Sequence, residues 1–264
     1  MSQSCAGAAW AIEARGLSKT FAGAGRGAAT VTAVDRVDLT VATGSIVGLL
    51  GPNGAGKTTI FRMLTTLIVP DSGTATIAGF DLRAAADGVR AHIGLVGQVG
   101  GADPDATGRE NLVLAGRLYG LGRAEAVARS AHLEEVFDLT GLANRIVRTL
   151  SGGQRRRLDI AIGLIHAPAV LFLDEPTTGL DPQNRANLWD QVRRLRDQGV
   201  TIVLTTHYLD EADALADRLY VLDHGQVIAQ GSPAELKRQY RADTLQAAFL
   251  SLTGRILRDN GDLS

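Results

Sequence analysis

The chain has 264 residues, a length that allows one large domain or two small ones. Lys plus Arg number 27 against 28 Asp plus Glu, so no basic excess points to nucleic acid as the main partner. Hydrophobic residues make up 45%, which is ordinary for a globular protein with a packed core. The single cysteine, Cys5, excludes an intramolecular disulfide and favours a reducing compartment. We expect no signal peptide and no segment that crosses a bilayer.

The residue pattern in the first part of the chain predicts a small sheet around a glycine-rich turn. Residues 1–10 are expected to form a flexible tail. Strands are predicted at 11–15, 31–41, 46–50 and 74–77, with a Gly/Ala-rich loop at 22–29. A helix is predicted from Gly56 to about Ile68, because Pro70 cannot continue it.

From about residue 100 to 167 the spacing of apolar residues becomes helical, which we interpret as a helical insert. Helices are predicted there at 109–118, 124–139 and 153–165. Strand and helix then alternate again, with strands at 169–173 and 200–204 and helices at 182–198 and 208–216. A hairpin is expected about His224 and Gly225, and Ser232 and Glu235 form the capping box of a further helix.

The stretch Gly51-Pro-Asn-Gly-Ala-Gly-Lys-Thr-Thr59 fits the phosphate-binding pattern G-x-x-x-x-G-K-[ST], with a strand before it and a helix after it. Glycines let successive N–H groups converge on phosphate oxygens, and the helix start adds unpaired donors. Lys57 supplies a cation for the β- and γ-phosphates. The Thr58 hydroxyl is suited to the ligand shell of Mg²⁺. A glycine turn with a chance lysine is the weaker alternative.

Asp174 and Glu175 follow a buried apolar strand, at the edge where ligands gather in an open α/β sheet. We predict that Asp174 is a Mg²⁺ partner, directly or through water, and that Glu175 is the base that polarises the attacking water. A strand-end turn is the common alternative for an isolated Asp-Glu pair.

A second glycine-rich segment, Leu150-Ser-Gly-Gly-Gln154, opens a helix and offers N–H groups as another anion cradle. Taken alone, Ser151 is as well explained as an ordinary helix cap. The following run, Arg155-Arg-Arg157, is interpreted as a partly solvated face that supports the site electrostatically.

These motifs, followed by Thr206-His207, occur in the order in which they occur in the ATPase subunits of ABC transporters, and the chain resembles that family from about residue 11 to 254. The resemblance implies an α/β P-loop NTPase with a RecA-like core, an N-terminal antiparallel β subdomain and a helical insert subdomain at about 100–167. The ATPase domain is expected at 11–240 and a short helical tail at 241–264, where Leu245, Phe249 and Leu252 pack on the core.

The resemblance also implies roles for further residues. Gln98 would sense Mg²⁺ and face the membrane subunits, although a glutamine after an apolar strand is otherwise an ordinary surface residue. Asp181 would contact the opposite subunit. His207 would contact the γ-phosphate, against the alternative of a structural histidine. Phe21 would stack on adenine, against the alternative of simple core packing.

The implied ATP-binding residues are Phe21, Gly51, Pro52, Asn53, Gly54, Ala55, Gly56, Lys57, Thr58 and Thr59, and the implied metal residues are Thr58, Gln98 and Asp174. The implied catalytic residues are Glu175 and His207. Ser151, Gly152, Gly153 and Gln154 would close on ATP that a second subunit holds, which requires a homodimer or a heterodimer with a homologous ATPase.

The tail and the segment after His207 resemble ATPases of the ABC-2 class, including the daunorubicin-type resistance exporters. This resemblance implies ATP and Mg²⁺ as cofactors, a separate transmembrane permease as partner and a peripheral place at the cytoplasmic face of the cell membrane. Drug, antibiotic or lipid-like cargo is implied, and no nucleic acid is expected. One alternative is a soluble ABC-type ATPase acting on ribosomes, nucleic acid or Fe–S assembly. Another is a nucleotide kinase or GTPase, which leaves residues 150–154 unexplained.

Overall fold

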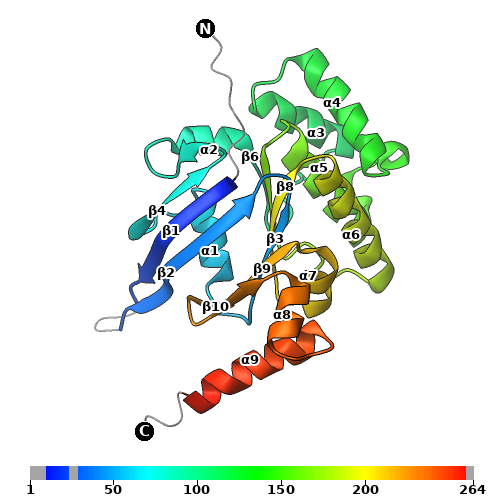
Figure 1. The fold of residues 1–264 in the computed structure, drawn as a ribbon. Coiled ribbons are helices and arrows are strands. Elements are labelled where there is room, and N and C mark those ends of the chain that lie inside the picture. The colour runs from blue at the N-terminus through cyan, green and yellow to red at the C-terminus, as the bar shows by residue number, and fades with distance from the viewer. Residues whose placement is uncertain (1–9, 24–28, 260–264) are drawn as a thin grey trace.

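The computed structural model describes residues 10–23 and 29–259 (Figure 1). Cys5, nearly all of the expected N-terminal tail and the middle of the Gly/Ala-rich loop lie outside the described residues. Within the described part of the chain, no helix is both long enough and apolar enough to cross a membrane.

A four-stranded antiparallel sheet forms the N-terminal layer, as predicted. Its strand order is β2-β1-β4-β5. The strands are β1 (Trp10–Phe21), β2 (Val31–Ala42), β4 (Ser72–Ile77) and β5 (Phe80–Asp81). β1 continues six residues beyond the predicted end at residue 15, because it pairs with both β2 and β4 and accommodates register shifts after Ala14 and Leu17.

A six-stranded sheet in the order β10-β9-β3-β8-β7-β6 forms the second layer. The strands are β3 (Ile46–Leu50), β6 (Ile93–Val96), β7 (Val170–Asp174), β8 (Thr201–Thr206), β9 (Arg218–Asp223) and β10 (Gln226–Gly231). β9, β3, β8, β7 and β6 run parallel, and β10 returns antiparallel through the predicted hairpin. The carboxyl ends of the parallel strands therefore meet at one edge, which is where an open α/β sheet binds ligands.

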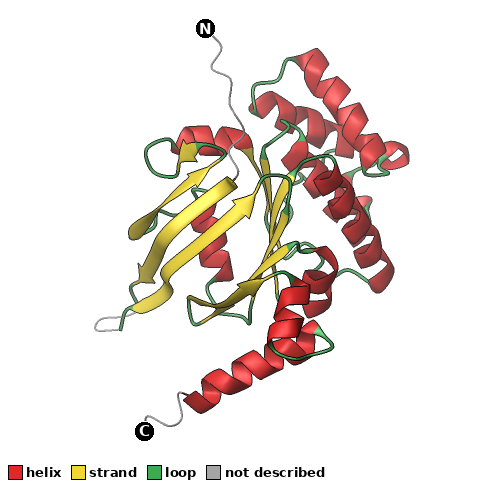
Figure 2. Cartoon of the chain, in the orientation of Figure 1, coloured by secondary structure: helices red, strands yellow, loops and turns green. Residues whose placement is uncertain are grey.

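Alternate residues of the central strands enter two different cores. Val170 and Phe172 of β7 pack with α1 (Lys57–Leu64) and the four-stranded sheet. Leu171 and Leu173 face the opposite core with the helices of the insert. Both faces of β7 are covered, which explains its uninterrupted apolar sequence. Figure 2 shows helices α3 to α6 on the side of the six-stranded sheet away from the four-stranded sheet.

The insert contains α3 (Gly108–Leu118), α4 (Arg123–Val136) and α5 (Gly152–Leu164), with short 3₁₀ turns at Thr140–Leu142 and Val147–Thr149. The three predicted helices of the insert are therefore confirmed. The seven-residue helix α2 (Ala86–His92) was not predicted. One residue of it, Val89, is buried, so its sequence carries no apolar stripe that would reveal a helix.

Two predicted helix ends were wrong. α1 ends at Leu64 rather than Ile68, because the Thr65 hydroxyl donates to the carbonyl of Phe61 and Thr66 has a left-handed φ of 61°. α4 ends at Val136 rather than residue 139, two residues before Asp138, whose φ is 52°. In both cases a local backbone reversal ends the helix before the apolar pattern stops.

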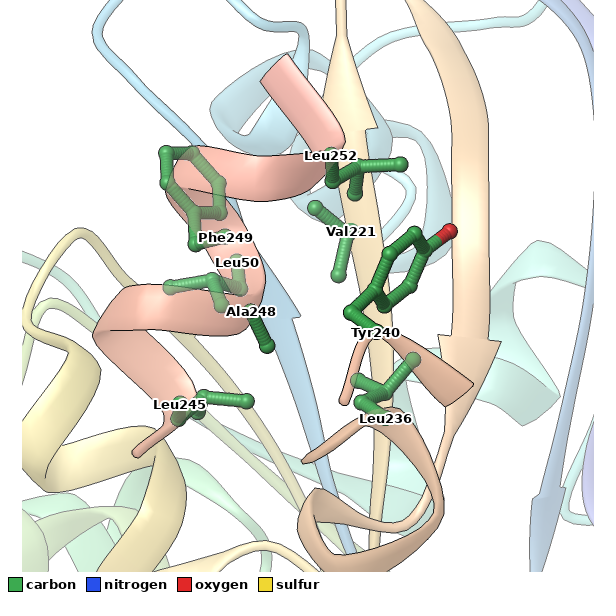
Figure 3. Close-up of a pocket in the computed structure, with 8 residues that line it drawn as sticks. All are labelled: Leu50, Val221, Leu236, Tyr240, Leu245, Ala248, Phe249 and Leu252. Atoms are coloured by element: carbon green, nitrogen blue, oxygen red, sulfur yellow. The ribbon is translucent and has the colours of Figure 1, made fainter. Parts of the chain in front are cut away.

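The C-terminal region packs as predicted. α6 (Pro182–Asp197) and α7 (Leu209–Leu215) precede the hairpin, and α8 (Pro233–Gln239) begins with a capping box between Ser232 and Glu235. Leu245 and Leu252 of α9 (Leu245–Asp259) are buried, and Phe249 is partly buried beside them. Figure 3 shows Leu245 and Leu252 in the group of side chains around Leu50 and Val221. These side chains line a cavity of about 10 Å³.

Candidate active site

The phosphate-binding loop lies between β3 and α1, as predicted. Gly51 and Gly56 lie so close to neighbouring backbone that a side chain would not fit at either position. A Cβ on Gly51 would lie 2.3 Å from the carbonyl oxygen of Leu222, and Gly56 has φ 100° with the carbonyl oxygen of Ala33 2.5 Å from its Cβ position. The loop is therefore packed between β2 and the β9–β10 hairpin, with its backbone shaped by glycine.

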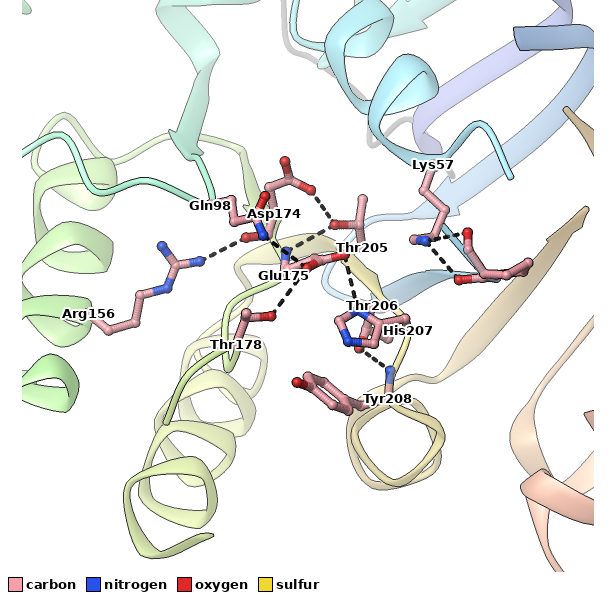
Figure 4. Close-up of polar contacts among 12 residues, drawn as sticks. Lys57, Gln98, Arg156, Asp174, Glu175, Thr178, Thr205, Thr206, His207 and Tyr208 are labelled. Atoms are coloured by element: carbon pink, nitrogen blue, oxygen red, sulfur yellow. Dashed lines mark hydrogen bonds and ion pairs between the residues drawn. The ribbon is translucent and has the colours of Figure 1, made fainter. Parts of the chain in front are cut away.

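Lys57 begins α1 and is 5% exposed. Its Nζ donates to the carbonyl oxygens of Gly51 (2.7 Å) and Pro52 (2.9 Å). Burial lowers the pKa of the Lys57 ammonium, while the negative charges of Glu175 and Asp174 act in the opposite direction. The cation is thus held within the loop, facing the carboxylates at the end of β7 (Figure 4).

Glu175 lies at the centre of a polar cluster drawn from three strand ends (Figure 4). Its Oε1 is 3.1 Å from Nδ1 of His207, which follows β8. Its Oε2 accepts hydrogen bonds from Nε2 of Gln98 (3.3 Å), after β6, and from the hydroxyl of Thr178 (3.2 Å). Three residues predicted from separate motifs, Gln98, Glu175 and His207, are therefore brought into direct contact.

Thr205 joins Asp174 to Glu175. Its hydroxyl, in a fully buried side chain, donates to Oδ1 of Asp174 and accepts from the backbone N–H of Glu175 at 3.0 Å. The same N–H also lies 3.2 Å from the carbonyl of Thr205. Sequence reasoning missed Thr205, although the parallel register pairs Asp174 with it.

The backbone of Glu175 is strained. Its φ is 43°, in the left-handed region that glycine favours. A residue other than glycine in this region costs on the order of 1–3 kcal/mol and persists where its surroundings hold it. The hydrogen bonds to Thr205 are part of that support, and they turn the carboxylate toward Gln98 and His207.

The second glycine-rich segment, residues 150–154, forms the N-terminal cap of helix α5. Ser151 caps α5, and its hydroxyl accepts from the N–H of Gln154 at 3.3 Å, while the Gln154 side chain accepts from the N–H of Ser151 at 3.0 Å. Ser151 and Gly152 are exposed. Gly152 lines a hollow of about 170 Å³ that Gln98 and Glu175 also line. The cap interpretation is confirmed, and the role of this segment toward a second subunit stays a prediction.

The interpretation of residues 155–157 as a partly solvated face holds for Arg155 and Arg157 but not for Arg156. Arg155 is exposed, but Arg156 is 8% exposed and Arg157 is half-buried. Arg156 donates to three backbone carbonyls near Glu175, and Figure 4 shows the bond to Asp174. Helical periodicity could have predicted the burial of Arg156, because Arg156 lies four residues before the buried Ile160 and shares its face.

Two other predicted site residues, Asp181 and Phe21, lie outside the polar cluster around Glu175. Asp181 caps α6, and its side chain accepts from the N–H of Asn184 at 2.9 Å. Phe21 ends β1 and is 41% exposed, with Nζ of Lys19 5.7 Å from its ring centre. This exposure argues against simple core packing for Phe21. Its contact with adenine stays a prediction.

Glu211 is a buried carboxylate behind the cluster that sequence reasoning did not single out. It lies on α7 with no exposed surface, and Nε1 of Trp189 donates to its Oε1 at 3.3 Å. Burial raises the pKa of Glu211, while the hydroxyls of Thr206 and Thr177 favour its ionised form. Its position links the strand end that carries His207 to helix α6.

The residues around Asp174 fit a hard cation that arrives with a nucleotide. The Thr58 side chain is exposed at the start of α1, and oxygen donors of the hydroxyl and carboxylate type suit Mg²⁺. Among the residues that the structure describes, no group of three or more His, Cys, Asp or Glu is placed to hold a metal. A cation with one carboxylate from the protein would take its remaining ligands from water and phosphate, which is how Mg²⁺ commonly binds.

Comparisons with known proteins agree with this geometry. Residues 34–178 match the model of the ABC transporter family. The chain is 50% identical over 236 residues to the daunorubicin/doxorubicin resistance ATP-binding protein DrrA of Streptomyces peucetius, covering 89% of this chain and 69% of that protein. It is 48% identical over 205 residues to the Nod factor export ATP-binding protein I of Ralstonia nicotianae, covering 78% of this chain and 64% of the relative.

Solved structures show the same fold. An ATP-binding subunit of an ABC transporter superposes with a TM-score of 0.78 at 28% identity, covering 92% of this chain and 99% of that one. A dimeric ATP-binding cassette with bound ADP and phosphate superposes with a TM-score of 0.74 at 26% identity, covering 84% and 98% of the two chains. The predicted α/β P-loop fold is therefore confirmed. The chain belongs to the ABC transporter family, as one of its ATP-binding, ATP-hydrolysing subunits.

Proposed function

We propose that this ATPase powers an ABC-2-type exporter of drug-like, antibiotic or lipid-like molecules, with separate permease subunits in the membrane. The observation that carries the ATPase part is the meeting of Gln98, Glu175 and His207 beside Lys57 at the carboxyl edge of the sheet. The names of the relatives, which refer to drug resistance and Nod factor export, support the export part. Ribosome, nucleic-acid and Fe–S alternatives gain no support from those names.

The residues divide the hydrolysis of ATP as follows. The N–H groups of the loop and the Lys57 ammonium bind the β- and γ-phosphates, which replace the carbonyls of Gly51 and Pro52 as partners of Nζ. Thr58 and Asp174 would hold Mg²⁺, which would neutralise charge on the phosphates. Glu175 orients the attacking water and accepts its proton, and His207 donates to the γ-phosphate.

Glu175 must exchange partners before it can act on water. Both of its carboxylate oxygens bond to protein groups, Oε1 to His207 and Oε2 to Gln98 and Thr178. A γ-phosphate near His207 competes with Oε1 of Glu175 for the imidazole. Binding of ATP would thereby release Oε1 for the water, so that the base becomes available when substrate is present.

A head-to-tail dimer completes the active site in this proposal. Ser151 and Gly152 are exposed at the start of α5, where N–H groups and the helix dipole attract anions. An isologous interface would set this helix start on the γ-phosphate bound by the other copy. The dimeric cassette among the structural relatives supports the arrangement. Because ATP binds the closed dimer better than ADP does, hydrolysis reopens it.

The permease is proposed to dock over the segment after Gln98 and over α3. Val99 is 88% exposed, and Leu114 and Leu118 on α3 are 57% and 78% exposed. The loop and the helix are tied together, since the N–H of Asp103 donates to Oδ1 of Asn111 at 2.7 Å. A partner that presses on this apolar surface therefore displaces Gln98 and the insert together.

The proposed hydrolysis and dimerisation are tested with Glu175→Gln. The variant should bind ATP with the affinity of the parent, lose turnover by about a hundredfold or more, and elute as a dimer when ATP is present. The parent, with ADP, is the monomeric control. Undiminished turnover removes Glu175 from its role, and a variant that stays monomeric at saturating ATP refutes the dimer.

The docking surface is tested with Leu118→Arg in cells that co-express the permease. Leu250→Arg is the matched control, because Leu250 is 63% exposed on α9, away from the insert. We expect the first variant to lose co-purification with the permease while both keep their ATPase rate as isolated chains. Retained co-purification of the first variant would place the permease on another surface.

A further inference from the structure

The guanidinium of Arg156 is buried beside the active site although no motif assigns it a task. Arg156 lies in the second turn of α5 and is 8% exposed. Its Nε donates to the carbonyl of Pro176 at 2.8 Å, its Nη1 to that of Gly97 at 2.6 Å and its Nη2 to that of Asp174 at 2.9 Å. One side chain thus binds two backbone segments that are far apart in the sequence, at Gly97 and at Asp174 to Pro176.

The three carbonyls adjoin the residues that hydrolysis needs. Asp174 and Pro176 flank Glu175, whose φ of 43° requires support from its surroundings. Gly97 directly precedes Gln98. The guanidinium therefore holds the backbone on both sides of the base and immediately before the glutamine, while its own helix begins at Ser151.

A second contact ties the same helix to the same loop. Asp159 lies three residues after Arg156 on α5 and is 6% exposed. Its Oδ1 accepts from the N–H groups of Gly101 (3.1 Å) and Ala102 (3.3 Å). The segment from Gly97 to Ala102 is accordingly held by α5 at both ends, with Gln98 between the two attachments.

We propose that Arg156 is a positioning residue for ATP hydrolysis, which fixes Glu175 and Gln98 relative to the helix that begins at Ser151. A shift of α5, produced by a second subunit at Ser151 or by a permease at the insert, is then transmitted to the base through the guanidinium. The inference rests on the proposed roles of Glu175 and Ser151 and adds the connection between them.

Arginine suits this position and lysine does not. The planar guanidinium directs its donors along fixed directions, and here they reach three carbonyls at once. An ammonium directs its donors from a single nitrogen on a flexible stem, so it would satisfy fewer of these carbonyls and hold them less firmly. Arg156→Lys therefore retains the charge and removes the geometry.

Arg157 supplies the matched control. It is the next residue of α5 and is half-buried, and its Nη1 donates to the carbonyl of Phe137 at 3.1 Å. Asp138 lies 3.7 Å from the same guanidinium. These partners belong to the helical insert, so Arg157→Lys disturbs a half-buried arginine of the same helix without touching Glu175 or Gln98.

The test measures kcat and ATP affinity on the full chain. Arg156→Lys should lower kcat by roughly tenfold to a hundredfold, as small misplacements of catalytic groups do, while ATP affinity stays near that of the parent. Arg157→Lys should leave kcat within about twofold of the parent. Parental kcat in the Arg156→Lys variant, or an equal loss in Arg157→Lys, overturns the inference.

Chemical rescue separates positioning from a general structural role. Guanidinium at a non-denaturing concentration should raise the kcat of Arg156→Ala and leave that of Arg157→Ala unchanged. Equal stimulation of both alanine variants would count against the inference. If Arg156→Ala does not fold, the Arg156→Lys result decides. The parent and Glu175→Gln are assayed in parallel, so an inactive parent refutes the proposed function, whereas an active parent with a fully active Arg156→Lys refutes this inference alone.

Discussion

Replacement of Thr205 by valine tests whether the hydroxyl between Asp174 and Glu175 holds the active site together. Valine keeps the β-branched shape of a fully buried side chain on β8, so the change removes the hydroxyl and creates no large cavity. The carboxylate of Asp174 loses a donor, and a hydrogen bond to a charged group contributes about 1.5–3 kcal/mol. The N–H of Glu175 also loses the hydroxyl as an acceptor, but it keeps the carbonyl of Thr205 at 3.2 Å, so this second loss adds little to the cost.

The expected cost is therefore about 2–3 kcal/mol in the free energy of unfolding, dominated by the bond to Asp174. For a chain of this size, each kcal/mol lowers Tm by roughly 2–4 °C, so Thr205→Val should melt roughly 4–12 °C below the parent. Turnover should fall by about tenfold or more, because Asp174 and the strained backbone of Glu175 lose a common support. Calorimetry without nucleotide and a steady-state ATPase assay measure the two effects.

Thr201→Val is the matched control on the same strand. Thr201 is also fully buried, and its hydroxyl accepts from the N–H of Gly44 at 3.0 Å, at the opposite end of β8. Loss of this neutral bond should cost about 1 kcal/mol and leave kcat unchanged. Thr205→Ser, which keeps the hydroxyl, should retain most of the turnover. Parental kcat in Thr205→Val, or an equal loss in Thr205→Ser or Thr201→Val, would refute the reasoning.

Three further results are expected. Lys57→Met should weaken ATP binding by roughly a hundredfold or more, because charge-assisted bonds contribute about 1.5–3 kcal/mol each; calorimetric titration with Lys237→Met as control checks this, and equal affinities would contradict it. Ser151→Ala and Ser232→Ala should each lose a helix cap worth about 1 kcal/mol, but only the former should lose ATPase activity; equal rates would remove Ser151 from hydrolysis. Because burial raises the pKa of Glu211 above its ordinary 4.5, its stabilising contribution is complete below that pH and is lost as pH rises through the raised pKa. The Tm of Glu211→Gln minus the Tm of the parent should therefore increase as pH rises over that range, because only the parent carboxyl ionises. A constant difference would count against a raised pKa for Glu211.

Short-range patterns were sufficient to locate the phosphate loop, the acidic strand end and the helix caps. Gly51, Gly56 and Lys57 share one turn, so their spacing along the chain already specifies their geometry. The capping box of Ser232 and Glu235 spans three residues, and the structure confirms it. The apolar runs also predicted strands that end before Gln98, Glu175 and His207, and the structure brings these three side chains together at one edge of the sheet.

Contacts between distant segments were decided only by the packing of the sheet on the insert. The pairing of Thr205 with Asp174 depends on the register between β7 and β8, which no local pattern encodes. The left-handed φ of Glu175 persists because neighbouring segments hold it, and no propensity of glutamate predicts it. The three arginines at 155–157 are chemically identical, yet the orientation of α5 leaves Arg155 in solvent and buries Arg156 against three carbonyls. Local sequence thus placed the groups that we propose to touch ATP, whereas the groups that hold them in place were determined by long-range packing.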